Sequence, residues 1–223
     1  MRRNEVLHRL KAWSDPRAVE GMARFGINPR RTYGISIPKL RWLAKEVGTD
    51  HALAQALWAS GIHEARILAG MIDDPGRVTS AQMERWVRQF DSWDVCDQVC
   101  MNLFDKTPLA HARALAWSRR EAEFVKRAGF ALMACLAWHD KSASDAAFLK
   151  FLPPIRRGAA DERNFVKKAV NWALRQIGKR NRALNRAAIE AAREIQKLGA
   201  KSAKWIAADA LRELQSAAVR KRL

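Results

Sequence analysis

The chain has 223 residues, 48% of them hydrophobic, and 41 Lys and Arg against 23 Asp and Glu, a formal net charge of +18. This length and apolar content are sufficient for a sizeable core and exclude a disordered polycation. The excess of positive charge favours nucleic acid as the binding partner, ahead of an anionic membrane surface. No apolar run approaches the roughly 20 residues that span a bilayer, and residues 1–6 lack the apolar core of a signal peptide. We therefore expect a soluble, cytoplasmic, nucleoid-associated protein.

Helical periodicity runs through almost every segment between breakers, and no stretch alternates with period two for more than a few residues. The sequence therefore predicts an all-α protein. The first expected helix covers 4–13, and Pro16, after Ser14-Asp15, opens a second helix that ends near Gly26. A long connector follows over 28–38, extended before its final proline, and a further helix then runs to residue 48.

From residue 49 onward the expected helices come in short pairs. These pairs are 49–60 with 63–72, 79–90 with 92–105, 107–118 with 121–138, 142–152 with 161–179, and 182–198 with 202–219. The breaks fall at Gly61, Asp74-Pro75-Gly76, Thr107-Pro108, Pro153-Pro154 and Gly199. A repeat of about 30 to 45 residues per antiparallel pair is typical of HEAT or armadillo-type solenoids. We predict a single HEAT-like helical-repeat domain over 1–223, a curved superhelix with a basic concave face; a compact helical bundle fits the same pattern.

The positive charge is concentrated in the last third of the chain. Residues 151–223 hold 18 Lys and Arg against 6 Asp and Glu, which is +12 of the total +18. Solvated helix faces would explain the number of charges but not the excess of one sign. We therefore expect a polyanion to dock on this region.

Residues 91–97, Asp-Ser-Trp-Asp-Val-Cys-Asp, place three carboxylates within seven residues of this basic chain. The first two residues are suited to cap the helix that follows, and Asp94 suits its positive end. Asp97 lies one turn deeper, at i+4 from Trp93, on a helix that is otherwise largely apolar, so we expect it to be partly buried or to line a cleft. Burying a carboxylate without a partner costs free energy, so a buried Asp97 would be either paired or functional. The sequence is consistent both with a salt bridge to an arginine and with a functional role.

Cysteine and histidine usage indicates no metal site. Cys96, Cys100 and Cys135 are too few for a disulfide framework and lack zinc-site spacing, and the five histidines are scattered, so we expect small core residues. Nine tryptophans against one tyrosine exceed what a helical core of this size usually needs. This excess predicts indoles at the surface or in a cleft.

Three stretches, in this order and spacing, read together as a known family: 33–41 (YGISIPKLR), 93–97 (WDVCD) and 164–175 (NFVKKAVNWALR). They resemble the DNA alkylation repair enzymes, the AlkD-like HEAT-repeat DNA glycosylases, and the resemblance extends over roughly residues 15–215.

The resemblance implies that Trp93, Asp97 and Trp172 line the cleft that holds the damaged nucleotide. It also implies that Arg127 binds the DNA backbone at the lesion and that Arg175 resembles a further phosphate-facing residue. Lys168 lies in the same run as Trp172 and Arg175 and is the remaining candidate for DNA binding. Taken alone, Trp172 would be assigned to core packing and the two arginines to the surface.

The chemistry of alkylated DNA is compatible with this residue set. A purine alkylated at N3 or N7 is cationic, so it can leave the sugar without protonation by a general acid. The protein then needs only a carboxylate, which stabilises the sugar cation and orients water, and indole faces for cation–π contact. No metal or organic cofactor is required. The resemblance implies that duplex DNA lies along the concave face without a pocket that encloses the base.

We therefore expect a monomeric DNA glycosylase of base excision repair that acts on double-stranded DNA carrying alkylated bases. Some members of the family lack the carboxylate or one indole and bind DNA without strong excision, whereas this chain retains all three residues. The alternative from another class is a non-catalytic HEAT-like scaffold that binds structured DNA or RNA, or an acidic protein.

Overall fold

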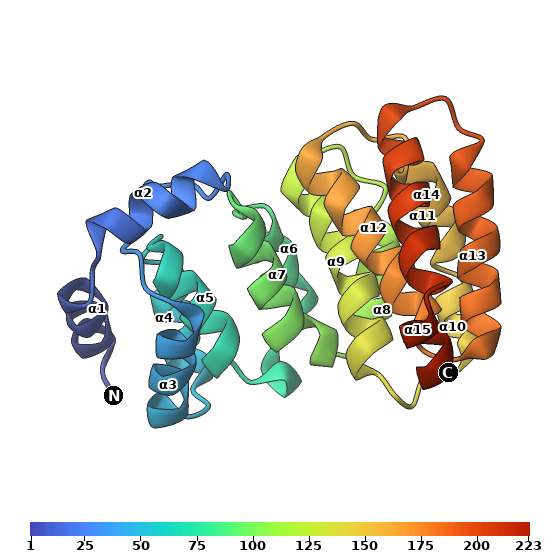
Figure 1. The fold of residues 1–223 in the computed structure, drawn as a ribbon. Helices are drawn as coiled ribbons and strands as arrows, with labels where there is room; N and C mark the ends of the chain where they lie inside the picture. Colours follow the sequence, from blue (N-terminus) through green and yellow to red (C-terminus); the bar gives the residue numbers. More distant parts are fainter. The chain divides into compact units, whose positions relative to one another are not determined.

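A computed structural model describes all 223 residues, and its only regular elements are helices (Figure 1). None of these helices combines the length and the hydropathy needed to cross a lipid bilayer. The chain forms two compact units, Met1–Thr107 and Pro108–Leu223, which we call the N-terminal unit and the C-terminal unit. The all-α prediction is confirmed. The prediction of one curved domain over 1–223 with a basic concave face stays a prediction.

The helices of the N-terminal unit follow the expected order. They are α1 (Arg3–Ala12), α2 (Pro16–Arg24), α3 (Ile37–Val47), α4 (His51–Trp58), α5 (His63–Ile72), α6 (Ser80–Val87) and α7 (Trp93–Asn102), with short 3-10 helices at η1 (Pro75–Arg77) and η2 (Phe104–Lys106).

Helix α5 is the centre of the N-terminal unit, because α1, α3, α4 and α7 all pack against it. Most of its residues are buried, and α7 approaches so closely that a side chain at Gly70 would lie 3.1 Å from Val99. A second part of the core is aromatic: the indoles of Trp58 and Trp86 stack in parallel with centroids 4.0 Å apart. The position of α7 is therefore set by close packing on α5.

The C-terminal unit contains the remaining helices. They are α8 (Ala110–Trp117), α9 (Glu123–His139), α10 (Asp145–Leu149), α11 (Leu152–Gly158), α12 (Asn164–Gly178), α13 (Arg182–Gln196), α14 (Lys201–Leu214) and α15 (Ala217–Arg222).

Helix α9 is the most buried element of the C-terminal unit and packs against both α8 and α12 (Figure 1). Its contact with the end of α8 needs a glycine, since a Cβ at Gly129 would lie 2.4 Å from the backbone nitrogen of Ser118. Helix α12 in turn packs against α13 and α14. One side of α12 is therefore covered by α9 and another by the last two long helices.

Local sequence signals predicted several helix ends correctly. Asp15 caps α2 by accepting hydrogen bonds from the backbone N–H groups of Arg17 and Ala18, as the Ser-Asp-Pro sequence indicates. Ser92 occupies the N-cap of α7, but its hydroxyl is buried and makes no capping hydrogen bond. The position predicted for this cap is confirmed, and the capping bond is absent.

Two predicted helices were wrong in their boundaries. The expected helix 142–152 is shortened to α10, and Pro153 and Pro154, predicted as a break, lie in the first turn of a further helix, α11, that was not predicted. The first N–H groups of a helix have no intrahelical acceptor, so proline is tolerated there. The expected helix 202–219 is interrupted: α14 ends at Leu214, and Ser216 caps the separate helix α15.

Two predictions about side-chain placement are confirmed. All three cysteines are free and buried in the core. Tryptophans lie both in the core and at the surface. Trp58, Trp86 and Trp117 are buried, whereas Trp42, Trp138 and Trp205 are exposed.

Candidate nucleic-acid interface

Helix α7 carries the first two predicted site residues. Trp93 is its first residue and Asp97 follows one turn later, and both side chains are half-buried. The apolar residues on the other faces of the helix, Val95, Cys96, Val99 and Cys100, are fully buried. The prediction that Asp97 is partly buried on an apolar helix is therefore confirmed.

The indole of Trp93 is held by the end of α2. Its Nε1–H donates a hydrogen bond to the backbone carbonyl of Phe25, at 3.1 Å. The phenyl ring of Phe25 is itself 74% exposed, which is unusual for a residue of this size. A neighbouring hydrogen bond, from Asn28 Nδ2 to Asp91 Oδ2 at 2.8 Å, joins the same two loops. The segment after α2 thus fixes the start of α7.

Asp94, the neighbouring carboxylate on α7, has a structural partner. It is buried, and its Oδ2 lies 2.8 Å from Nε2 of His63 on α5, while Nδ1 of His63 lies 3.7 Å from Glu64. Burial opposes protonation of His63, but the hydrogen bond to Asp94 and the nearby negative charge of Glu64 outweigh it and raise the pKa of His63 to about 9. At neutral pH a charged imidazolium therefore joins α5 to α7.

Glu64 links this buried cluster to the connector before α3. Its carboxylate is fully buried and accepts hydrogen bonds from the backbone N–H groups of Tyr33, Gly34 and Ile35 at 2.7–3.2 Å. Burial would raise the pKa of Glu64, but the contacts with His63 and the backbone hold it below its usual value. Gly34 has a φ of +78°, and a Cβ there would lie 2.4 Å from the carbonyl oxygen of Asp15.

Sequence reasoning missed both His63 and Glu64. The only local signal was an adjacent histidine and carboxylate at the start of a helix, which is not specific. The cluster nevertheless positions α7, and with it Trp93 and Asp97, relative to α5 and to the connector. We regard His63 as a positioning residue.

Arg127, on α9 of the C-terminal unit, is much less accessible than a phosphate-binding arginine usually is. It is 5% exposed, and its Nη1 donates a hydrogen bond of 2.5 Å to the carbonyl of Phe165 in the first turn of α12. The side chain therefore joins α9 to α12. Its predicted contact with DNA stays a prediction.

The start of α12 is fixed to α9 by charged groups. Asp161 accepts hydrogen bonds from the guanidinium and the backbone of Arg163 and lies 3.2 Å from the ammonium of Lys126. The Arg163 hydrogen bonds, despite some burial, lower the pKa of Asp161 to about 2. These contacts set the direction of α12 and of the side chains along it.

Three predicted residues lie on α12. Lys168 is exposed and Trp172, at i+4 on the same face, is half-buried. Arg175 is not free: its Nη1 lies 3.1 Å from Asp209 and 2.8 Å from Glu213, both on α14. Lys168 is thus more accessible to a polyanion than Arg175 is.

The structure therefore brings Arg127, Lys168, Trp172 and Arg175 together on two neighbouring helices of the C-terminal unit. Trp93 and Asp97 lie one turn apart in the N-terminal unit. The prediction that both groups contact one nucleotide stays a prediction.

Comparisons with known proteins agree with the resemblance seen in the sequence. A solved structure described as "a new family of proteins related to the HEAT-like repeat DNA glycosylases with affinity for branched DNA structures" is similar over 100% of this chain and 96% of that chain, with a TM-score of 0.82 and 21% identity. This likeness confirms the HEAT-like helical fold. No curated protein matches the chain. The sequence model described as DNA alkylation repair enzyme matches residues 6–214, and the chain therefore belongs to this family.

Proposed function

We propose that the protein is a DNA glycosylase of base excision repair that hydrolyses the N-glycosidic bond of cationic N3- or N7-alkylated purines in duplex DNA. The observation that carries this proposal is the placement of Asp97, a half-buried carboxylate one turn from the half-buried indole of Trp93. Asp94 does not fit this role because His63 binds it in the interior. Asp97 is the less buried of these two carboxylates, and it is the one that lies one turn from Trp93.

The main contribution that the protein must make to this reaction is electrostatic stabilisation. The alkylated purine already carries a positive charge, so breaking the glycosidic bond releases it as a neutral base without a general acid. The bond electrons leave with the base, and the sugar develops positive charge that Asp97 stabilises while orienting water for attack. The indoles of Trp93 and Trp172 contribute cation–π attraction of about 0.5–2 kcal/mol each.

Affinity for DNA comes from the positive charge of the C-terminal unit. Lys168 is the most accessible of the predicted phosphate ligands, and it shares a helix face with Trp172. Arg175 contributes less, since two carboxylates already bind it, and Arg127 acts from a largely buried position. Binding of this kind weakens as salt is added, because phosphate contacts release counterions.

The test is single-turnover release of 7-methylguanine and 3-methyladenine from methylated duplex DNA. We expect the wild type to release both bases and Asp97→Asn to lower the rate by about 100-fold or more, a loss comparable to removing one preorganised electrostatic group from an active site. Duplex affinity should be unchanged or slightly higher, because a negative charge near phosphate has been removed.

Glu20→Gln is the matched control, because it removes one negative charge from an exposed position on α2. This variant should release bases at the wild-type rate. Unchanged release by Asp97→Asn would contradict the catalytic role of Asp97, and binding of duplex without any release by the wild type would contradict the glycosylase proposal as a whole.

The second candidate is a non-catalytic protein that binds branched DNA. The observation in its favour is the similar solved structure, which is described as having affinity for branched DNA structures. Competition between a four-way junction and a linear duplex of equal length distinguishes the two. Preference for the junction, equal in wild type and Asp97→Asn and without base release, would establish this second function.

A further inference from the structure

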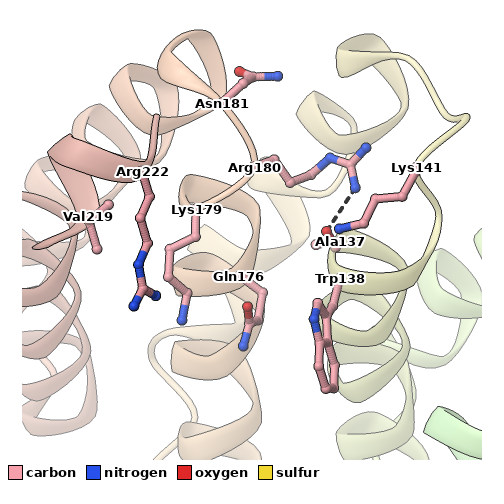
Figure 2. A pocket seen from close by; sticks show the side chains of 9 residues that line it. All are labelled: Ala137, Trp138, Lys141, Gln176, Lys179, Arg180, Asn181, Val219 and Arg222. Atoms are coloured by element: carbon pink, nitrogen blue, oxygen red, sulfur yellow. Dashed lines mark hydrogen bonds between the residues drawn. The ribbon is translucent and has the colours of Figure 1, made fainter.

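A basic pocket in the C-terminal unit lies apart from the residues discussed so far. Its volume is about 430 Å³, and it is formed where the last turns of α9 and α12 meet α15 (Figure 2). The lining residues include four cations and no carboxylate: Ala137, Trp138, Lys141, Gln176, Lys179, Arg180, Asn181, Val219 and Arg222. A volume in the usual range of small-ligand sites, about 300–1,000 Å³, suits one nucleotide and is too small for a duplex.

Two of the four cations are engaged within the protein. Arg180 donates a hydrogen bond of 2.8 Å to the carbonyl of Ala137, and its guanidinium lies 3.9 Å from the ring centroid of Phe148. Burial lowers the pKa of Arg180. Lys179 pairs with Glu213 at 2.8 Å. The side chains of Lys179 and Arg180 therefore form part of the wall of the pocket.

The other two cations, Lys141 and Arg222, are exposed and have no carboxylate partner. They reach the pocket from different elements, the loop after α9 and helix α15, as Figure 2 shows. Two unpaired cations on different sides of a cavity whose lining includes no acidic residue favour an anionic ligand.

Trp138 supplies the apolar surface of the pocket. It lies in the last turn of α9 and is 52% exposed, although most large side chains of this unit are buried. Figure 2 shows its indole on the opposite side of the pocket from Lys179 and Arg222, with the amide of Gln176 between them. An aromatic plane, an amide and two free cations match the base and the phosphate of one nucleotide.

The pocket lies at the C-terminal end of α12, beyond the side of this helix that is proposed to bind DNA. Lys168, Trp172 and Gln176 are spaced at i, i+4 and i+8, and Lys179 is seven residues beyond Trp172. Seven residues of helix rise about 10 Å, which corresponds to about three base steps of a DNA strand. A strand that passes Trp172 along this helix reaches the pocket within a few nucleotides.

We propose that the pocket binds one unpaired nucleotide of DNA, with the base stacked on Trp138 and the phosphates on its two sides bound by Lys141 and Arg222. The ring of His139 stacks on the Trp138 indole with centroids 4.7 Å apart, and the indole is still 52% exposed. An acidic peptide would use the two cations but would place no planar group on this exposed surface, so a nucleotide is the better match. The inference rests on the proposed DNA binding and adds a preference for DNA with a single-stranded segment, such as an overhang or a gap.

The experiment compares the affinity of the wild type for a blunt duplex and for the same duplex with a short single-stranded overhang, by fluorescence anisotropy. We expect tighter binding to the overhang substrate. Trp138→Ala should lose about tenfold in affinity for the overhang substrate, a typical effect of losing one base–aromatic stack, and nothing for the blunt duplex. Trp138→Phe should recover part of the loss.

Trp205→Ala is the matched control, because Trp205 is 42% exposed on α14 and lies outside the pocket. It should leave both affinities unchanged. Equal wild-type affinity for the two substrates, equal losses for Trp138→Ala and Trp205→Ala, or stronger competition by polyglutamate than by a single-stranded oligonucleotide would each overturn the proposal.

The pocket and the glycosylase proposal fail separately in this design. Base release from blunt methylated duplex depends on Asp97 and not on Trp138, whereas the overhang preference depends on Trp138 and not on Asp97. Loss of the preference in Trp138→Ala with no base release by the wild type would retain the pocket and reject the glycosylase.

Discussion

The two units of the molecule differ in how they use charge. The N-terminal unit has 16 Lys and Arg against 13 Asp and Glu, a net +3, whereas the C-terminal unit has 25 against 10, a net +15. The proposed catalytic carboxylate lies in the nearly neutral unit, and most of the attraction for a polyanion comes from the other. This separation allows a carboxylate to be retained in a basic protein without cancelling the charge that binds DNA.

The two units also differ in how deeply their histidine–aspartate pairs are buried. In the N-terminal unit, the His63 and Asp94 side chains are 4% and 12% exposed. In the C-terminal unit, the pair between His111 and Asp140, at 3.0 Å, has side chains that are 36% and 25% exposed. The first pair is part of the core and the second is open to solvent, so the same kind of contact should contribute very differently to stability.

The largest expected effect comes from breaking the buried pair. His63→Gln removes the charge that compensates Asp94 and Glu64, and should lower the free energy of unfolding by about 3 kcal/mol. His111→Gln should cost less than about 1 kcal/mol, because its pair is partly solvated. Urea unfolding at neutral pH measures both. Similar losses for the two variants would show that burial does not distinguish the pairs.

A second prediction uses pH to sharpen the same contrast. Because the pKa of His63 is raised from 6.5 to about 9, its contribution to stability is complete below pH 6.5 and is lost as the pH rises through 9. The difference in unfolding free energy between wild type and His63→Gln should therefore shrink by about 3 kcal/mol between about pH 6 and pH 10. A difference that stays constant over this range would mean that His63 is not protonated in the fold.

The third prediction concerns the unequal charge of the two units. Lys168→Gln, in the C-terminal unit, should weaken duplex binding several-fold and lower the slope of log affinity against log salt by about 1. Lys45→Gln removes an exposed cation from α3 of the N-terminal unit and should change neither quantity. Equal effects of the two substitutions, measured by anisotropy across a salt series, would contradict the assignment of DNA binding to the C-terminal unit.

The smallest effect is expected within the C-terminal unit itself. Arg175→Gln should change the salt slope by well under about 1, because Asp209 and Glu213 already neutralise this arginine. A change as large as that of Lys168→Gln would show that the arginine leaves its partners to bind phosphate.

Much of the helical pattern could be predicted from the sequence because it depends on neighbouring residues. The cap at Asp15 and the apolar faces of α7 are local features, and they follow from capping chemistry and from the 3.6-residue period. The prolines at 153 and 154 were misread as a break, since a proline pair is equally compatible with a loop and with a first helical turn.

The candidate site divides in the same way. The sequence by itself determined that Trp93 and Asp97 share one face of α7, because four residues make about one helical turn. Only the tertiary structure decided that Asp94 is paired, that Arg127 is buried and that Arg175 is held by α14, because each of these contacts joins residues more than thirty positions apart. Helix periodicity fixes directions along a single element, whereas burial and charge pairing depend on which elements pack together, and that is a property of the whole fold.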